Sequence, residues 1–224
     1  MEPRPISQRE SHISSGEKFR VAVLISGGGT NLQALLDAAT VGSIAAEVCL
    51  VISSNPEAVG LERAKRAGVP TAVFRSKDFP DLPSFRRALL ESLRDSGARL
   101  LVLAGYMKKL PREVLRAYPD AIINIHPALL PRFGGKGYFG RRVHAAVLAA
   151  GERVSGATVH LVTEGYDEGP NLLQEQIPVR SDDTVESLAA RVLAVEHRLL
   201  PAAVQAFADG RVRSQGGRVW VEPA

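Results

Sequence analysis

The feature that most constrains the fold is an alternation of short apolar runs with helical patterns over the first half of the chain. The apolar runs span 20–26, 46–53, 71–74, 99–105 and 121–126. The helical patterns between them, two of which end at a glycine, span 31–39, 57–68, 83–97 and 111–118. Strands that are apolar throughout are typical of parallel sheets covered by helices on both faces.

The last third of the chain follows a different pattern. A helix is predicted over 137–151, and two strands without a long helix between them over 156–163 and 171–179. A long amphipathic helix is expected to begin near Asp182 or Asp183 and to kink or break at Pro201. The sequence therefore predicts an α/β, Rossmann-like fold: a mainly parallel twisted sheet with helices on both faces and an antiparallel C-terminal extension.

Composition narrows the class of protein. The 224 residues are 45% hydrophobic, and we expect one domain over residues 19–224 after a polar, disordered tail over 1–18. A net charge of +4 fits an anionic small ligand as well as a nucleic acid. Aromatics amount to only 5% and do not interleave with a basic patch, so no nucleic-acid partner is expected. Cys49 is the only cysteine, which excludes a disulfide framework.

Targeting and metal-binding patterns are also missing from the sequence. No stretch resembles a signal peptide, and no apolar run approaches the ~20 residues of a membrane-spanning helix. We therefore expect a cytoplasmic protein without a membrane partner. No spacing of His, Cys, Asp and Glu resembles a metal site, so no metal is expected.

A glycine-rich stretch, "LISGGGTNLQALL" (24–36), joins the first predicted strand to the first predicted helix. Glycines let the backbone approach a ligand, and a helix N-terminus offers free N–H groups to an anion. No Lys-Ser/Thr follows as in a Walker A loop, and the dinucleotide fingerprint is incomplete. Phosphate binding is favoured over a tight structural turn because Thr30 and Asn31 add side-chain donors.

The strand at 121–126 ends with a polar pair, Asn124 and His126, followed by Pro127. Positions i and i+2 of a strand face the same side, roughly 7 Å apart along the chain. A carboxamide and an imidazole therefore converge at the carboxyl end of a strand, where α/β folds bind ligands. The alternative is a capping Asn and a hydrogen-bonded structural His. A second loop at the carboxyl end of a predicted strand is "LAGYMKKLP" (103–111), which taken alone is interpreted as a connecting loop without a functional role.

Later segments of the chain contain the remaining candidate functional residues. "PALLPRFGGKGYFG" (127–140) is basic and has four glycines within seven residues, which favours a mobile flap over a disordered surface loop. Asp167, in "VTEGYDEGPNLLQ", is either a turn carboxylate or the partner of an imidazole, and spacing cannot place it near His126. His144 and His160 are interpreted as structural, and Glu196 and His197 as facing different directions on a helix.

Taken together, these segments resemble a known family. "VAVLISGGGTNLQALL", "VLAGYM", "NIHPALLP", "VTEGYDEGP" and "VEHRLLP" occur in this order and at similar intervals in the phosphoribosylglycinamide formyltransferases. The motif around Asn124 and His126, with the later Asp167, marks the wider folate-dependent formyltransferase superfamily. The Ser-Gly-x-Gly-[ST]-Asn opening is more specific to enzymes that use the ribonucleotide.

This resemblance implies an enzyme of purine biosynthesis. It would transfer the formyl group of 10-formyltetrahydrofolate to the glycinamide amine of 5'-phosphoribosylglycinamide, giving tetrahydrofolate and the N-formyl product. The resemblance also implies catalytic roles for Asn124, His126 and Asp167. The residues that it places on the ribonucleotide are Gly29, Thr30, Asn31 and Glu196. Those that it places on the folate are Met107, Lys108, Lys109, Leu110 and Asn124. A homodimer is considered as well.

One position departs from the family pattern. Leu82 stands about where many members carry an arginine that contacts the folate, so Lys108 or the basic residues of the flap would substitute for it. We further expect Asp167 to raise the pKa of His126, so that imidazolium is available near neutral pH.

Other readings of the motifs remain open. One is a sibling enzyme that formylates methionyl-tRNA or hydrolyses formyltetrahydrofolate, although the additional domains of those enzymes have no room in this chain. The other is a non-catalytic nucleotide-binding module, which explains the glycine loop but not the set of Asn124, His126 and Asp167.

Overall fold

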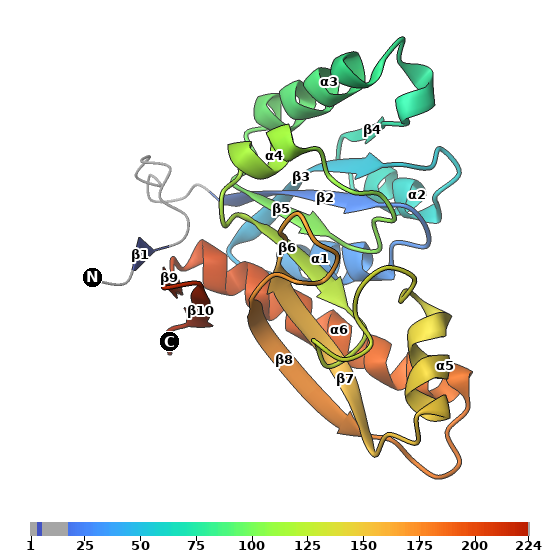
Figure 1. Ribbon diagram of the computed structural model, residues 1–224. Helices are drawn as coiled ribbons and strands as arrows, with labels where there is room; N and C mark the ends of the chain where they lie inside the picture. Colours follow the sequence, from blue (N-terminus) through green and yellow to red (C-terminus); the bar gives the residue numbers. More distant parts are fainter. Residues whose placement is uncertain (1–3, 6–17, 224) are drawn as a thin grey trace.

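The computed structural model describes residues 4–5 and 18–223, and its core is a seven-stranded sheet with the order β4-β3-β2-β5-β6-β7-β8 (Figure 1). In sheet order, the strands are β4 (Thr71–Val73), β3 (Ala46–Ser53), β2 (Phe19–Ile25), β5 (Leu100–Leu103), β6 (Ile122–His126), β7 (Val154–Leu161) and β8 (Asn171–Pro178). The first five are parallel, whereas β7 and β8 are antiparallel to their neighbours. The predicted fold class, including the antiparallel extension, is confirmed.

Helices cover both faces of this sheet (Figure 1). One layer comprises α1 (Thr30–Thr40), α2 (Val59–Arg66) and α6 (Val185–Ala208). The opposite layer contains α3 (Leu82–Asp95) and α4 (Arg112–Ala117), and a short 3-10 turn, η1 (Ser76–Asp78), precedes α3. Successive residues of β2 alternate between the layers: Val21 and Val23 join the α1–α6 core, and Ala22 and Leu24 join the α3–α4 core. Burial on both faces is why the strands are apolar without a break.

Helix α6 differs in two ways from the prediction. It begins at Val185 after a capping box made by Thr184 and Ser187, slightly later than expected. It also runs through Pro201 without interruption, so the predicted break is wrong. A proline costs a helix about 3 kcal/mol. The residues around Pro201, among them Leu200 and Val204, are fully buried against the sheet. Burial stabilises by roughly 1.5–3 kcal/mol for each large apolar side chain, so the packing of α6 outweighs the cost of the proline.

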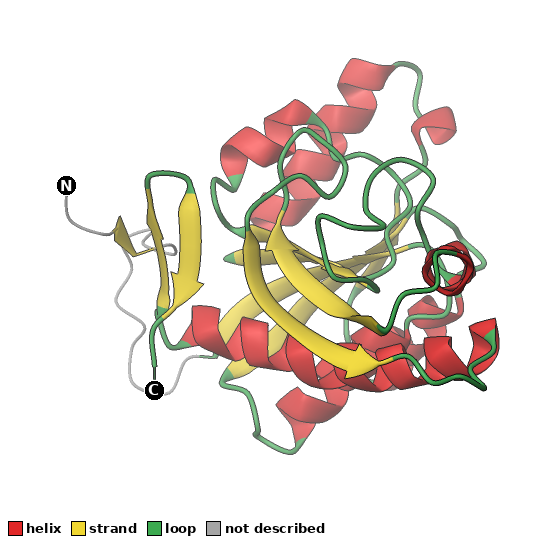
Figure 2. Cartoon of the chain, turned by 60° about the horizontal axis from the view of Figure 1, so that its bottom comes forward, coloured by secondary structure: helices red, strands yellow, loops and turns green. Residues whose placement is uncertain are grey.

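A second, three-stranded antiparallel sheet lies beyond the end of α6 (Figure 2). It comprises β1 (Arg4–Pro5), β9 (Val212–Gln215) and β10 (Arg218–Val221). The β9–β10 hairpin was not predicted from the sequence, although its turn, Gly216-Gly217, has positive φ at both positions. The disordered tail predicted over 1–18 falls mostly outside the described residues. The domain limits stay a prediction.

The parallel strands β2, β5 and β6 end at the same edge of the sheet (Figure 1). The loops that follow them, 26–29, 104–111 and 127–140, therefore meet at that edge, where ligands bind in open α/β sheets. The last of these loops leads into α5 (Arg141–Ala149).

Candidate active site

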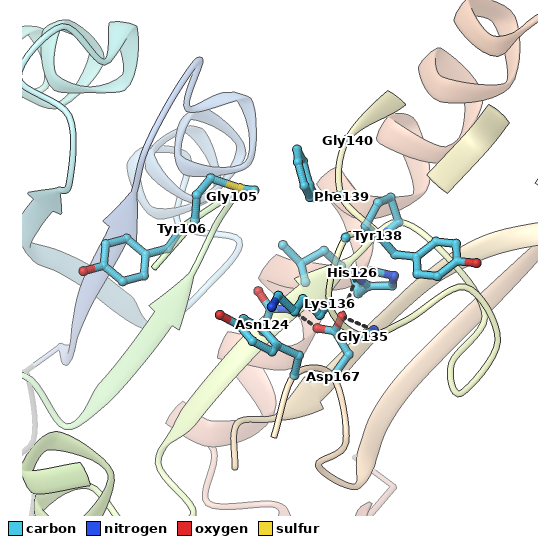
Figure 3. A pocket seen from close by; sticks show the side chains of 15 residues that line it. Gly105, Tyr106, Asn124, His126, Gly135, Lys136, Tyr138, Phe139, Gly140 and Asp167 are labelled. Carbon is cyan, nitrogen blue, oxygen red and sulfur yellow. Dashed lines mark hydrogen bonds and ion pairs between the residues drawn. The ribbon is translucent and has the colours of Figure 1, made fainter. Parts of the chain in front are cut away.

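Three polar side chains from two parts of the chain meet at this edge of the sheet. Asn124 and His126 project from β6, while Asp167 lies in the loop between β7 and β8 (Figure 3). Asp167 Oδ2 is 3.5 Å from Nδ1 of His126, and its Oδ1 is 3.4 Å from Nδ2 of Asn124. The alternating residues of β6, Ile123 and Ile125, point into the opposite core. The structure thus brings Asp167 to the pair of Asn124 and His126, a proximity that the sequence could not establish.

Asp167 is held as an ionised carboxylate. Its backbone adopts a left-handed conformation with φ of 56°, and the main-chain N–H of Gly135 donates to Oδ2 at 2.9 Å. Burial acts to raise the pKa of this carboxyl. The interactions with His160, His126 and Gly135 together outweigh burial, so the net pKa lies below its ordinary value. The site therefore carries a fixed negative charge beside His126.

His126 is 4% exposed and is oriented by the flap. Its Nε2 donates to the carbonyl oxygen of Phe133 at 2.8 Å, which leaves Nδ1 facing Asp167. Burial lowers the pKa of His126, and the Asp167 charge offsets only part of this effect. The expected contribution of Asp167 is present, but the net direction is opposite to the expectation of an imidazolium favoured near neutral pH.

His160 is a contact of the site that sequence reasoning interpreted as merely structural. It lies in β7 as the cross-strand neighbour of Asn124. Its Nδ1 is 2.8 Å from the carbonyl oxygen of Leu161 and must donate there, so Nε2 of the neutral ring accepts from Asn124 Nδ2 at 3.0 Å. This network fixes which way the Asn124 carboxamide points. The role of His160 could have been suspected from the sequence, because this residue lies on the predicted strand that leads into the loop of Asp167.

A cavity of about 290 Å³ opens above these residues (Figure 3). Besides Asn124, His126 and Asp167, it is lined by Met107 and by the flap residues from Gly135 to Gly140. The predicted folate residues Lys108, Lys109 and Leu110 line two adjoining cavities of about 90 and 560 Å³. The flap thus lies beside the predicted catalytic residues, as the sequence suggested.

The larger adjoining cavity is rich in positive charge. Leu82, 53% exposed, lines it beside five basic side chains. These are Arg75, Lys77, Arg86, Lys108 and Lys109. Arg75 is paired with Asp78, whereas Lys77 and Lys108 have no ion pair among the described residues. An anionic group would therefore find cations at this end of the site.

The glycine-rich loop forms a second group of site residues at the start of α1. Gly29 caps this helix with φ of 69°, and a Cβ there would lie 2.6 Å from the Cα of Gly60 in α2. Glycine at this position is therefore required for the left-handed backbone and for packing against α2. The main-chain N–H groups from Gly28 to Asn31 have no protein acceptor in the described part of the chain. The loop is thus a tight structural turn whose free N–H groups are of the kind that bind anions, and phosphate binding there stays a prediction.

Glu196 joins this group from α6. Asn31 Nδ2 donates to Glu196 Oε2 at 2.6 Å, and the Oδ1 of Asn31 is buried without a partner in the part of the chain that the structure covers. Glu196 is 7% exposed, and burial raises its pKa to about 7, against the smaller lowering effect of Asn31. Thr30, Asn31 and Glu196 line none of the three cavities described above.

Two further features of the described residues bear on ligand classes. Residues 4–5 and 18–223 contain no group of three or more His, Cys, Asp or Glu side chains placed to hold a metal ion. Over the same residues, no helix is long and apolar enough to cross a membrane.

Comparison with known proteins agrees with this geometry. The family model described as formyl transferase matches residues 19–204. Phosphoribosylglycinamide formyltransferase of Haemophilus influenzae is 37% identical over 203 residues, which cover 91% of this chain and 93% of that protein. The chain therefore belongs to the formyl transferase family.

A plant relative and a solved structure extend the comparison. The chloroplastic phosphoribosylglycinamide formyltransferase of Vigna unguiculata is 43% identical over 194 residues, covering 86% of this chain but only 62% of that longer protein. The crystal structure of glycinamide ribonucleotide transformylase 1 from Symbiobacterium toebii superposes with a TM-score of 0.87 and 45% identity, covering 97% of this chain and 100% of that one.

Proposed function

We propose that the protein transfers the formyl group of 10-formyltetrahydrofolate to the glycinamide amine of 5'-phosphoribosylglycinamide. The observation that carries the proposal is the meeting of Asn124, His126 and Asp167 at a cavity beside the loop of Met107. Relatives that match nearly the whole of this chain are named phosphoribosylglycinamide formyltransferase and glycinamide ribonucleotide transformylase, which supports the choice of substrates.

The reaction needs donors for a developing oxyanion. The amine attacks the formyl carbon, a C–N bond forms, and the carbonyl oxygen takes the negative charge. When this intermediate collapses, the bond to N10 of the folate breaks and N10 keeps the electron pair and takes up a proton. Donors aimed at such an oxyanion are each worth roughly 3–4 kcal/mol. His126 and Asn124 are the two candidate donors at the cavity.

The hydrogen bonds of His126 determine which atom can act. Because its Nε2–H is committed to the carbonyl of Phe133, Nδ1 carries a proton only when the ring is charged. Donation from Nδ1 to the oxyanion therefore requires imidazolium. Asp167, 3.5 Å from Nδ1, favours that form and, through water, is placed to take the proton that the amine loses.

Asn124 has one N–H that is only weakly held. The first N–H is held by His160 at 3.0 Å. The second points at Asp167 over 3.4 Å, at the long end of the range for a hydrogen bond. This weakly held N–H is the one that we assign to the oxyanion, which would have to lie along the direction in which that N–H already points.

The ribonucleotide would bind across the start of α1. The unpaired N–H groups from Gly28 to Asn31, together with the Thr30 hydroxyl, suit its phosphate. Glu196, as a carboxylate, would accept a hydrogen bond from a hydroxyl of the ribose. Because its pKa is about 7, lowering the pH below neutrality should weaken ribonucleotide binding.

The folate would occupy the cavities lined by Met107 to Leu110, with its glutamate carboxylates in the basic cavity. Leu82 stands where many family members have a folate-contacting arginine. Lys108, supported by Lys77 and Arg86, would take over the role of that arginine. Lys108→Ala should raise the KM for 10-formyltetrahydrofolate and leave that for the ribonucleotide unchanged. Arg87 does not line this cavity, so Arg87→Ala is the control. An equal KM for 10-formyltetrahydrofolate in both variants would refute the role of Lys108.

The chemistry can be tested by following the formyl carbon. With 13C-formyl donor and the ribonucleotide, mass spectrometry should find the label on the glycinamide nitrogen. Label recovered only as formate would support hydrolysis of the donor instead. The homodimer, the cytoplasmic location and the absence of a resident metal stay predictions.

A further inference from the structure

We propose that Arg63, on α2, is a positioning residue for the phosphate of the ribonucleotide. It holds the glycine-rich loop so that the N–H groups of the loop face the substrate. The inference rests on the proposed function, because the phosphate comes from the substrate assigned there. Arg63 itself would not touch the phosphate.

Two successive carbonyl oxygens of the loop are anchored to α2. The carbonyl of Gly27 accepts from the main-chain N–H of Gly60 at 3.0 Å, and the carbonyl of Gly28 accepts from Nε of Arg63 at 2.9 Å. In a trans peptide the N–H points opposite to the carbonyl. Holding these carbonyls toward α2 therefore turns the N–H groups of Gly28 and Gly29 away from it.

The loop also has open space beside it. A Cβ added at Gly27 or Gly28 would meet nothing within 4 Å. Next to the loop, Asn31 is nine-tenths buried and its Oδ1 lacks a partner among the described residues. Unused main-chain donors, open space and an unsatisfied buried polar atom at one place are what an anion site with a polar ligand requires.

Arg63 is the side chain that completes this anchoring. The third carbonyl, that of Gly29, is held by the main-chain N–H of Gln33 within the first turn of α1. Arg63 Nη1 also donates to Gln33 Oε1 at 3.2 Å, so one guanidinium joins α2, the loop and α1. A charged donor on the Gly28 carbonyl also polarises that peptide and makes the N–H of Gly29 a better donor to phosphate.

The experiment compares three variants of the full chain: Arg63→Ala, Arg63→Lys and, as control, Arg66→Ala on the same helix. Arg66 contacts the carbonyl of Glu62 and not the loop. We expect Arg63→Ala to raise both the ribonucleotide KM and the Ki of inorganic phosphate about tenfold, the effect of losing one charge-assisted hydrogen bond. The folate KM and kcat at saturation should change less than twofold.

Arg63→Lys separates positioning from charge. A lysine keeps the charge but cannot hold Gly28 and Gln33 with one planar fork, so its ribonucleotide KM should stay close to that of Arg63→Ala. Gln33→Ala, which removes only the second anchor, should give a smaller rise and serves if Arg63→Ala does not fold. A wild-type KM in Arg63→Ala, or full rescue by lysine, would overturn the proposal. Wild-type protein that makes no formylated product would instead refute the proposed function.

Discussion

Replacing Glu196 with glutamine should make the stability of the protein less dependent on pH. Burial raises the pKa of this carboxyl from 4.5 to about 7, so the folded protein holds the proton more tightly than the unfolded chain does. At about 1.36 kcal/mol for each pH unit, the difference corresponds to about 3 kcal/mol. This stabilisation is fully present below pH 4.5, is lost as the pH rises to about 7, and does not change further above it.

Glutamine has nearly the same shape, is neutral at every pH and can still accept from Asn31. Urea unfolding of the wild type and of Glu196→Gln should therefore give similar free energies of unfolding near pH 4.5. The variant should become the more stable one toward pH 7, by about 3 kcal/mol, with a plateau above. Glu91→Gln, at an exposed position of α3, is the control. A difference that does not vary with pH would show that burial does not protonate Glu196 and would refute the reasoning.

Three further predictions concern the ribonucleotide, the oxyanion and the flap. Gly28→Val should fold, because a Cβ there meets nothing within 4 Å, and should raise the ribonucleotide KM about tenfold; an unchanged KM would remove the phosphate assignment. Asp167→Asn should lower kcat about a hundredfold and shift the His126 titration, followed by NMR, to lower pH. Asn124→Ala should lower kcat without that shift, and a titration that Asp167→Asn leaves unmoved would make Asp167 a turn residue. Hydrogen exchange over 132–140 should slow when both ligands bind, and exchange already slow in the free protein would indicate a rigid loop.

The fold could be predicted from the sequence because its main signals are local. Continuous apolar runs such as 20–26 and 46–53 indicate strands buried on both faces, and glycines such as Gly68 mark helix ends. The hairpin at the C-terminus was missed because two short strands around Gly216-Gly217 lack a buried alternating pattern. Pro201 misled the prediction because packing of α6 on the sheet, which no local rule contains, outweighs the cost of a helical proline.

The site was predictable only in part. Strand geometry placed Asn124 and His126 together, but the approach of Asp167 depends on the antiparallel pairing of β6 with β7, which spacing does not reveal. The same pairing brings His160 to Asn124. The net pKa of His126 was also out of reach, because it depends on burial under the flap as much as on the nearby charge.

The most direct test is the rate at which chelator-treated protein converts 10-formyltetrahydrofolate to tetrahydrofolate, with and without the ribonucleotide. If the site transfers formyl to the glycinamide amine, tetrahydrofolate should form only when the ribonucleotide is present, one for each N-formyl product. Formation at the same rate with water alone would contradict the account and indicate a hydrolase.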